Sequence, residues 1–168
     1  MATRGSEPVT QARLKELLHY DPETGAFTRR LTNRRWKAGT VAGCWSEPAG
    51  WVIRVDDNLY LAHRLAWLFM TGDWPKNEID HIDVSRRNNR WENLREATGS
   101  QNKANKHKQS NNTSGFKGVS FQKGIDKYRA RIRAHGRSRS LGCFDNPQDA
   151  HAAYVAAASG IWGEFARA

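Results

Sequence analysis

Glu78-Ile79-Asp80-His81-Ile82-Asp83 is the densest cluster of reactive side chains in this sequence, and the polar stretch RRNNRWENLREAT (86–98) follows it. Asp80 and His81 are adjacent, so a strand would place their side chains on opposite faces. Two such side chains do not hold one ion together in the simplest way, which indicates different roles. An Asp carboxylate is a hard oxygen ligand suited to Mg²⁺, whereas a neutral His accepts a proton from water near pH 7.

A helix is predicted to begin directly after this stretch. Thr98-Gly99-Ser100-Gln101 fits the capping box, in which the two end residues satisfy backbone N–H groups at a helix start. The pattern places Asn102 in the first turn, where its amide oxygen is a candidate second metal ligand. The competing interpretation is that the Asp-His pair occurs by chance and that Asn-rich stretches are solvated loops or helix caps.

The sequence before this cluster predicts two short helices and a hairpin. Thr10 can cap a helix with Leu14, Leu17 and Leu18 on one face, and Asp21-Pro22-Glu23-Thr24-Gly25 is a turn sequence that ends it. Residues 51–55 and 59–62 flank Asp56-Asp57-Asn58 and favour a hairpin, although such short apolar runs also suit a buried helix. A second helix is predicted over 63–71, ending at Gly72. We interpret His63, at its start, as a structural residue rather than a ligand.

Beyond the cluster, the periodicity changes to strict alternation. In KYRARIR (127–133) the odd positions are basic and the even ones apolar or small, so a strand would carry a core face and a row of cations. With 118–121 and 139–144 it predicts a three-stranded antiparallel meander. A helix follows, capped by Asp145 or Asn146, with small residues on one stripe before Gly160. We assign six apolar residues of this part to the core: Phe116, Phe121, Tyr128, Leu141, Phe144 and Tyr154.

The charge of the chain favours a polyanionic partner. Its 168 residues include 27 Lys/Arg and 17 Asp/Glu, a formal charge of +10 with pI about 10.1. Residues 101–168 hold 12 Lys/Arg and 4 Asp/Glu, and thus +8 of that charge. No apolar run is long enough to span a bilayer and no charged-then-apolar leader opens the chain, so we expect a cytoplasmic protein. Cys44 and Cys143 are far apart, which excludes a disulfide framework and predicts two small buried residues.

In order and approximate spacing, HRLAWLF (63–69), DHID (80–83), NNRWENLREAT (88–98) and SQN (100–102) resemble the HNH endonucleases of the ββα-metal fold, in the phage and intron homing branch. The resemblance implies that Asp80 and Asn102 coordinate one divalent cation, Mg²⁺ or Mn²⁺. It implies that His81 is the general base, and that Asn93 braces the loop between the two strands, with support from Asn89.

The implied reaction is phosphodiester hydrolysis to 5′-phosphate and 3′-hydroxyl ends. His81 would deprotonate a water aimed at phosphorus, and the cation would neutralise the charge that grows in the transition state. The sequence departs from the family pattern twice. Asn102 stands where the name-giving pattern has His, as in other homing members, and Val84-Ser85 replaces the Gly-Asn that often follows DHxD. The second departure leaves the geometry of the loop open.

The C-terminal part resembles another family, the APETALA-type or ethylene-response-factor DNA-binding domain, in the form appended to phage HNH proteins. The residues that carry the resemblance are SGFKGV (114–119), KYRARI (127–132), LGCF (141–144) and AHAAY (150–154). In that family a three-stranded sheet lies in the major groove and a helix packs behind it. The positions that match its DNA contacts are Lys117, Ser120, Gln122, Lys127, Arg131 and Arg133, and Arg129 shares their face. Ser138 and Ser140 replace an Arg and a Trp of the plant proteins, so the target sequence cannot be carried over.

We therefore expect an α+β protein: a ββα-metal HNH nuclease domain (1–104) with an N-terminal helix and hairpin, a linker (105–113), and a three-stranded antiparallel sheet packed on one helix (114–168). The expected function is a metal-dependent homing-type DNA endonuclease that binds double-stranded DNA through the C-terminal sheet. If the protein is phage-encoded, its setting is the host cytoplasm. The alternative is a catalytically silent DNA-binding regulator on an HNH scaffold, and RNA is a further candidate substrate. No protein partner is evident, and the oligomeric state and the choice between nick and double-strand break stay open.

Overall fold

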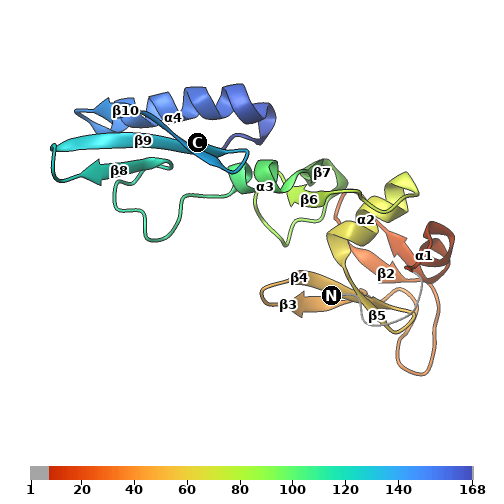
Figure 1. Cartoon of the computed structure of the whole chain (residues 1–168). Coiled ribbons are helices and arrows are strands. Elements are labelled where there is room, and N and C mark those ends of the chain that lie inside the picture. The colour runs from red at the N-terminus through yellow and green to blue at the C-terminus, as the bar shows by residue number, and fades with distance from the viewer. Residues whose placement is uncertain (1–7, 168) are drawn as a thin grey trace. The chain divides into compact units, whose positions relative to one another are not determined.

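The computed structural model describes residues 8–167, which belong to two compact units that divide between Glu96 and Ala97 (Figure 1). Over this range the secondary structure is mixed, with four α-helices and four small sheets. No helix in the same range is long and apolar enough to cross a membrane.

The first unit is built from two α-helices, seven strands and one short 3₁₀ helix. Its elements are α1 (Gln11–Leu17), β1 (Leu18–Tyr20), β2 (Phe27–Arg29), β3 (Cys44–Ser46), β4 (Gly50–Val55), β5 (Asn58–Leu61), α2 (Ala62–Thr71), β6 (Glu78–His81), η1 (Trp91–Asn93) and β7 (Leu94–Ala97). Strands β1 and β2 pair antiparallel, β3-β4-β5 form an antiparallel sheet, and β6 and β7 form the third sheet. The hairpin over β4 and β5 confirms the predicted one.

Helix α2 supplies the centre of this unit's core. Its buried side chains are Ala62, Leu65, Ala66 and Leu68, and the helix ends at Gly72, which has a left-handed φ of 92°. Leu14 of α1 and Tyr20, Phe27 and Ile53 of the strands complete the cluster around it. The predicted end of this helix is thus confirmed, because Gly adopts the left-handed conformation that closes a helix without a Cβ clash.

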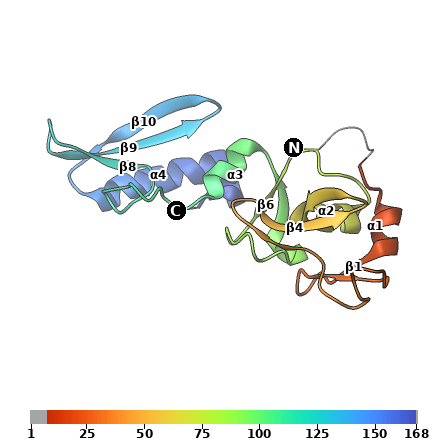
Figure 2. The same cartoon turned by 90° about the horizontal axis from the view of Figure 1, so that it is seen from below.

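The second unit is a sheet covered by a helix. It contains α3 (Gly99–Asn105), β8 (Val119–Gln122), β9 (Lys127–Ala134), β10 (Arg137–Phe144), α4 (Pro147–Trp162) and η2 (Gly163–Phe165). The three strands are antiparallel in the order β10-β9-β8, as predicted. Helix α4 runs along one face of the sheet in both views (Figures 1 and 2). Asn146 caps it, with its side chain accepting from the Asp149 N–H, and Pro147 opens it.

Small residues let α4 lie close to the sheet. Ala130 of β9 and Ala150 of α4 are fully buried. Gly118, at φ +74°, has no room for a Cβ, because a Cβ there would lie 2.1 Å from the Tyr154 ring. The core continues under α3, since Ala104 packs with Ile132, Tyr154 and Trp162.

Three expectations about single residues are wrong. Cys44 and Cys143 are exposed, because each lies on a strand of a small sheet that has one face open to solvent. Leu18 belongs to β1 and not to the first helix, although it is buried with Leu14. Phe121 is 39% exposed, although it shares the core face of the sheet with Val119 and contacts Tyr128 across the strands.

Candidate active site

The candidate site lies on β6 and on the loop that leads from it to β7. Asp80 and His81 are the last two residues of β6, and their exposed fractions are only 4% and 6%. Glu78, at the start of the same strand, is exposed. Both reactive side chains are therefore held within the protein rather than in bulk water.

The carboxylate of Asp80 forms an ion pair with Arg95 of β7. Arg95 Nε and Nη2 both lie 3.1 Å from Asp80 Oδ2. The side chains are 12% and 5% exposed, so water screens this pair far less than a surface pair. The ion pair fixes the carboxylate beside the strand that follows the loop.

His81 is held by a chain of contacts that reaches the N-terminal strands. Its Nε2 lies 3.0 Å from Asn89 Oδ1, and the backbone carbonyl of Asn89 accepts a hydrogen bond of 2.7 Å from the Tyr20 hydroxyl. Tyr20 is buried in the core, and its burial raises the pKa of its hydroxyl. The donor and acceptor roles in this contact depend on the imidazole tautomer, and a hydrogen on Nε2 would donate to the amide oxygen of Asn89.

Gly25, in the turn between β1 and β2, packs against the backbone of Asn89. It has a φ of +75°, and a Cβ at this position would lie 2.4 Å from the backbone carbon of Asn89. The turn and the loop of the site are therefore in direct backbone contact, which only glycine permits.

His63 lies against the imidazole of His81. The two rings meet edge to face with centroids 5.1 Å apart. Burial, and secondarily the charge of His81, lower the pKa of His63 to about 3. His63 is therefore neutral at physiological pH and covers one side of the His81 ring.

Asn93 braces the loop between β6 and β7. Its Oδ1 accepts from the Asp83 N–H at 2.9 Å, and its Nδ2 donates to Asp83 Oδ1 at 2.9 Å and to the Asn88 carbonyl at 2.7 Å. Asp83 also accepts from the Ser85 N–H and the Asn88 amide. Burial alone raises the pKa of Asp83, but the hydrogen bonds from Asn88, Ser85 and Asn93 outweigh it and lower the pKa.

Val84 occupies the turn of this loop in a left-handed conformation. Its φ is 68°, and its N–H donates to the His81 carbonyl at 2.9 Å. Glycine adopts this conformation freely, whereas a β-branched residue is strained in it. The turn that a Gly would form is thus present, with Val84 in its place.

Asn102 lies in the first turns of α3, within the second unit. Both hydrogen bonds of the predicted capping box are present between Thr98 and Gln101, and the Asn102 N–H donates to the Thr98 carbonyl at 2.9 Å. The prediction for the start of this helix is confirmed. Between residues 8 and 167 there is no group of three or more His, Cys, Asp or Glu side chains able to hold a metal ion.

The predicted DNA-contacting residues lie on or before the three-stranded sheet. Arg131 and Arg133 are exposed on β9, whereas Ala130 and Ile132 between them are buried. Arg129 faces Ser120 across the β8–β9 pairing, and Lys127 forms an exposed ion pair with Asp145 at 3.0 Å. Ser120 is exposed and Gln122 half-buried on β8.

Lys117 takes a different environment from these cations. It precedes β8, and its ammonium donates to the carbonyls of Ala104, Lys106 and Arg167 at 2.5, 2.7 and 3.0 Å. Burial lowers the pKa of Lys117 to about 8. In this structure Lys117 joins three backbone segments of the second unit.

Sequence reasoning missed three residues that build the site, Tyr20, Gly25 and Arg95, and it interpreted His63 as a structural residue without placing it beside His81. Tyr20, Gly25 and His63 act over long sequence separations, so no local pattern marks their place in the site. Arg95 offered a usable signal, because it lies in the NLR stretch on the strand paired with β6.

Residues 60–104 match the family model described as HNH endonuclease. Protein 3.8 of Escherichia phage T7 is 35% identical to the chain over 80 residues, which are 47% of this chain and 66% of that protein. The chain therefore spans just under two thirds of the length of this distant relative. No solved structure matches the chain.

Proposed function

We propose that the protein is a metal-dependent DNA endonuclease of the HNH homing type, which hydrolyses phosphodiester bonds to 5′-phosphate and 3′-hydroxyl ends. The observation that carries the proposal is the buried end of β6. Asp80 is fixed there by Arg95, and His81 is oriented by Asn89, within the residues that match the HNH endonuclease model. A helix cap or a solvated loop requires neither burial nor this orientation.

In the proposed reaction His81 is the general base. With hydrogen on Nε2 and Asn89 as its acceptor, the ring presents Nδ1 to take the proton of the attacking water. His63 and Asn89 restrict the ring, which lowers the cost of positioning the base. Asn93 keeps the loop in the conformation that carries these groups.

Asp80 and Asn102 would hold one divalent cation, Mg²⁺ or Mn²⁺. Their donors are a carboxylate and an amide oxygen, which are hard ligands of the kind these ions prefer. Arg95 Nε and Nη2 contact Asp80 Oδ2 and hold the carboxylate in place. When bound, the cation supplies positive charge that stabilises the phosphate as charge develops on it.

We propose that the C-terminal sheet binds the DNA. The exposed cations of β9 alternate with buried core residues, so they form one face of the sheet. A cavity of about 630 Å³ beside it is lined by Lys103, Lys106, Lys108 and Arg131. The proposal keeps the domain division expected from the sequence: 1–104, a linker over 105–113, and 114–168. The first residue of this linker, Asn105, is the last residue of α3. Near its other end, the Asn112 amide donates to the Phe116 carbonyl at 2.9 Å.

A supercoiled-plasmid assay tests the catalytic proposal. We expect wild type and His19→Ala to open the plasmid with Mg²⁺ and not with a chelator, and His81→Ala to leave it intact. His19 is the matched control because it is an exposed histidine on β1. A pool of randomised duplexes is tested in the same assay, so that a recognition sequence absent from the plasmid is still sampled. Linear product would indicate paired active sites.

A binding measurement on the same proteins separates catalysis from recognition. His81→Ala should keep wild-type DNA affinity, whereas Arg131→Ala should lose about 1–3 kcal/mol at most. No cleavage of any substrate by wild type, with binding retained, would support the alternative, a silent DNA-binding regulator. If Arg131→Ala bound DNA with unchanged affinity, β9 would not be part of the DNA-binding surface.

A further inference from the structure

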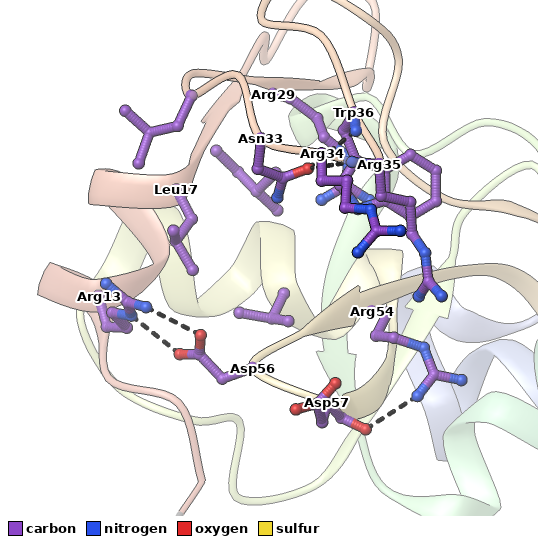
Figure 3. Close-up of a pocket in the computed structure, with 13 residues that line it drawn as sticks. Arg13, Leu17, Arg29, Asn33, Arg34, Arg35, Trp36, Arg54, Asp56 and Asp57 are labelled. Atoms are coloured by element: carbon purple, nitrogen blue, oxygen red, sulfur yellow. Dashed lines mark hydrogen bonds and ion pairs between the residues drawn. The ribbon is translucent and has the colours of Figure 1, made fainter.

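A basic pocket lies in the first unit, outside the residues that match the HNH endonuclease model. Its volume is about 770 Å³, and five arginines and two aspartates line it together with apolar and amide side chains. Figure 3 shows Arg34, Arg35 and Trp36 gathered on one side with Arg54 below them, and the Arg13–Asp56 pair on the other side. The arginines are Arg13, Arg29, Arg34, Arg35 and Arg54.

The negative charges of the pocket do not balance its arginines. The carboxylate of Asp56 is paired with Arg13, which donates to both of its oxygens at 2.9 Å. Among the described residues, Arg54 donates only to the backbone carbonyl of Asp57, at 3.1 Å. Within residues 8–167, the other four arginines form no ion pair. The pocket thus keeps a positive field that a bound anion would neutralise.

Arg29 adds a second, independent sign of a ligand. Its Nε is buried and has no hydrogen-bond partner among the described residues. Its guanidinium lies over the Trp36 ring, 4.2 Å from the ring centroid. Burial lowers the pKa of Arg29, so the folded chain maintains this cation at a cost that nearby carboxylates do not offset.

The loop that carries Arg34, Arg35 and Trp36 is already ordered for binding. Asn33 Oδ1 accepts from the N–H groups of Arg35 and Trp36 at 2.9 and 2.8 Å, and the Asn33 N–H donates to the Trp36 carbonyl at 2.8 Å. The side chains of residues 31–37 are all exposed. A row of solvated charges needs no such internal bracing, whereas a site that meets a rigid partner benefits from it.

We propose that this pocket is a second DNA-binding site, in which Arg34, Arg35 and Arg54 hold phosphates of the DNA backbone. Arginine forks match phosphate oxygens in pairs, and an open pocket with spread charges suits a polymer better than a small enclosed anion. The inference relies on the proposed function only in taking DNA as the polyanion. The pocket would let the first unit bind DNA through contacts separate from those of the C-terminal sheet.

The test measures DNA binding by the full chain at several salt concentrations, in a chelator so that cleavage does not interfere. The probe is a short DNA duplex of mixed sequence. Arg34→Gln/Arg35→Gln is compared with Lys15→Gln/Lys76→Gln, which removes the same charge from exposed positions of the same unit outside the pocket. The two arginines are exposed, so we expect both variants to fold, which circular dichroism checks.

We expect the arginine variant to bind about tenfold or more weakly at moderate salt. The slope of log affinity against log salt should fall by about 0.9 for each lost phosphate contact, and thus by roughly 2 in total. The lysine variant should keep the wild-type slope. Equal salt slopes for the two variants would overturn the proposal. An equal loss of affinity for polyaspartate, which has no phosphates, would also overturn it, and so would tighter binding of an RNA duplex than of the DNA duplex. A failure of the nuclease proposal appears in the plasmid assay and leaves this slope unchanged.

Discussion

At the scale of residues, the site depends on contacts between segments that are remote in sequence. Tyr20 and Asn89 are 69 positions apart, yet one hydrogen bond joins them and Asn89 in turn pairs with His81. The short motif supplies the reactive groups, and the N-terminal strands supply their position. This division predicts that a change far from the motif impairs cleavage.

Gly25→Ala tests that dependence. The added Cβ would lie 2.4 Å from the Asn89 backbone, so the loop must shift and the contact between His81 Nε2 and Asn89 Oδ1 is lost. Gly39→Ala is the control, because Gly39 has a similar φ of +81° but open space around it. The left-handed conformation destabilises each variant by about 1–2 kcal/mol, and the clash destabilises Gly25→Ala by roughly 1–3 kcal/mol more.

Urea unfolding and plasmid cleavage measure the two effects. We expect Gly39→Ala to keep its cleavage rate at temperatures where it is folded, and Gly25→Ala to lose at least about tenfold. Equal stability and equal activity of the two variants would show that the turn does not support the loop.

The pH dependence of stability is predicted from His63. Its pKa is about 3 in the folded protein and about 6.5 in an unfolded chain. Between these values only the unfolded state binds the proton, so the contribution of His63 is complete above pH 6.5 and is lost as the pH falls toward 3. The slope is at most about 1.4 kcal/mol per pH unit.

Unfolding at pH 7 and pH 5 measures this contribution. Wild type should lose about 1–2 kcal/mol more than His63→Asn on going to pH 5. His19→Asn, which changes an exposed histidine, should behave as wild type. A His63→Asn variant with the full wild-type pH dependence would contradict the assigned burial.

At the scale of elements, the structure follows the sequence wherever one local signal sets a boundary. The Thr98 capping box, the Asn146 cap and the Gly72 terminus were predictable, because each acts within one helical turn. The placement of His63 against His81 was not predictable, since it depends on how α2 packs against β6. Lys117 was predicted on the sheet face, and its carbonyl partners come from α3, the segment after it and the C-terminus, which no periodicity reveals.

The loop between β6 and β7 shows how one element tolerates an unfavourable residue. Val84→Gly should raise the stability of the protein by about 1 kcal/mol. The left-handed φ costs a β-branched residue roughly 1–2 kcal/mol, and the greater flexibility of Gly in the unfolded chain returns part of that gain. Ser85→Gly, at a neighbouring position without a positive φ, should lower stability. Urea midpoints that fall equally in both variants would contradict the strain.

At the scale of the whole molecule, each of the two units has its own hydrophobic core. The first cluster gathers residues from Val9 to Leu94 of β7, and the others draw only on residues from α3 onward. The charge asymmetry of the sequence anticipated a distinct C-terminal part. It gave no sign of the arginine pocket, because residues 1–100 carry 15 basic and 13 acidic residues, and their near balance hides a local excess.

Each of the two units carries one exposed thiol, so redox conditions can decide whether two copies of the chain are joined by a disulfide. Cys44 or Cys143 can form a disulfide with a second copy of the chain, since neither is shielded. In the proposed nuclease, such a covalent pair would join two copies of the site on β6. Linear plasmid that appears only without reductant would therefore report oxidation rather than native pairing.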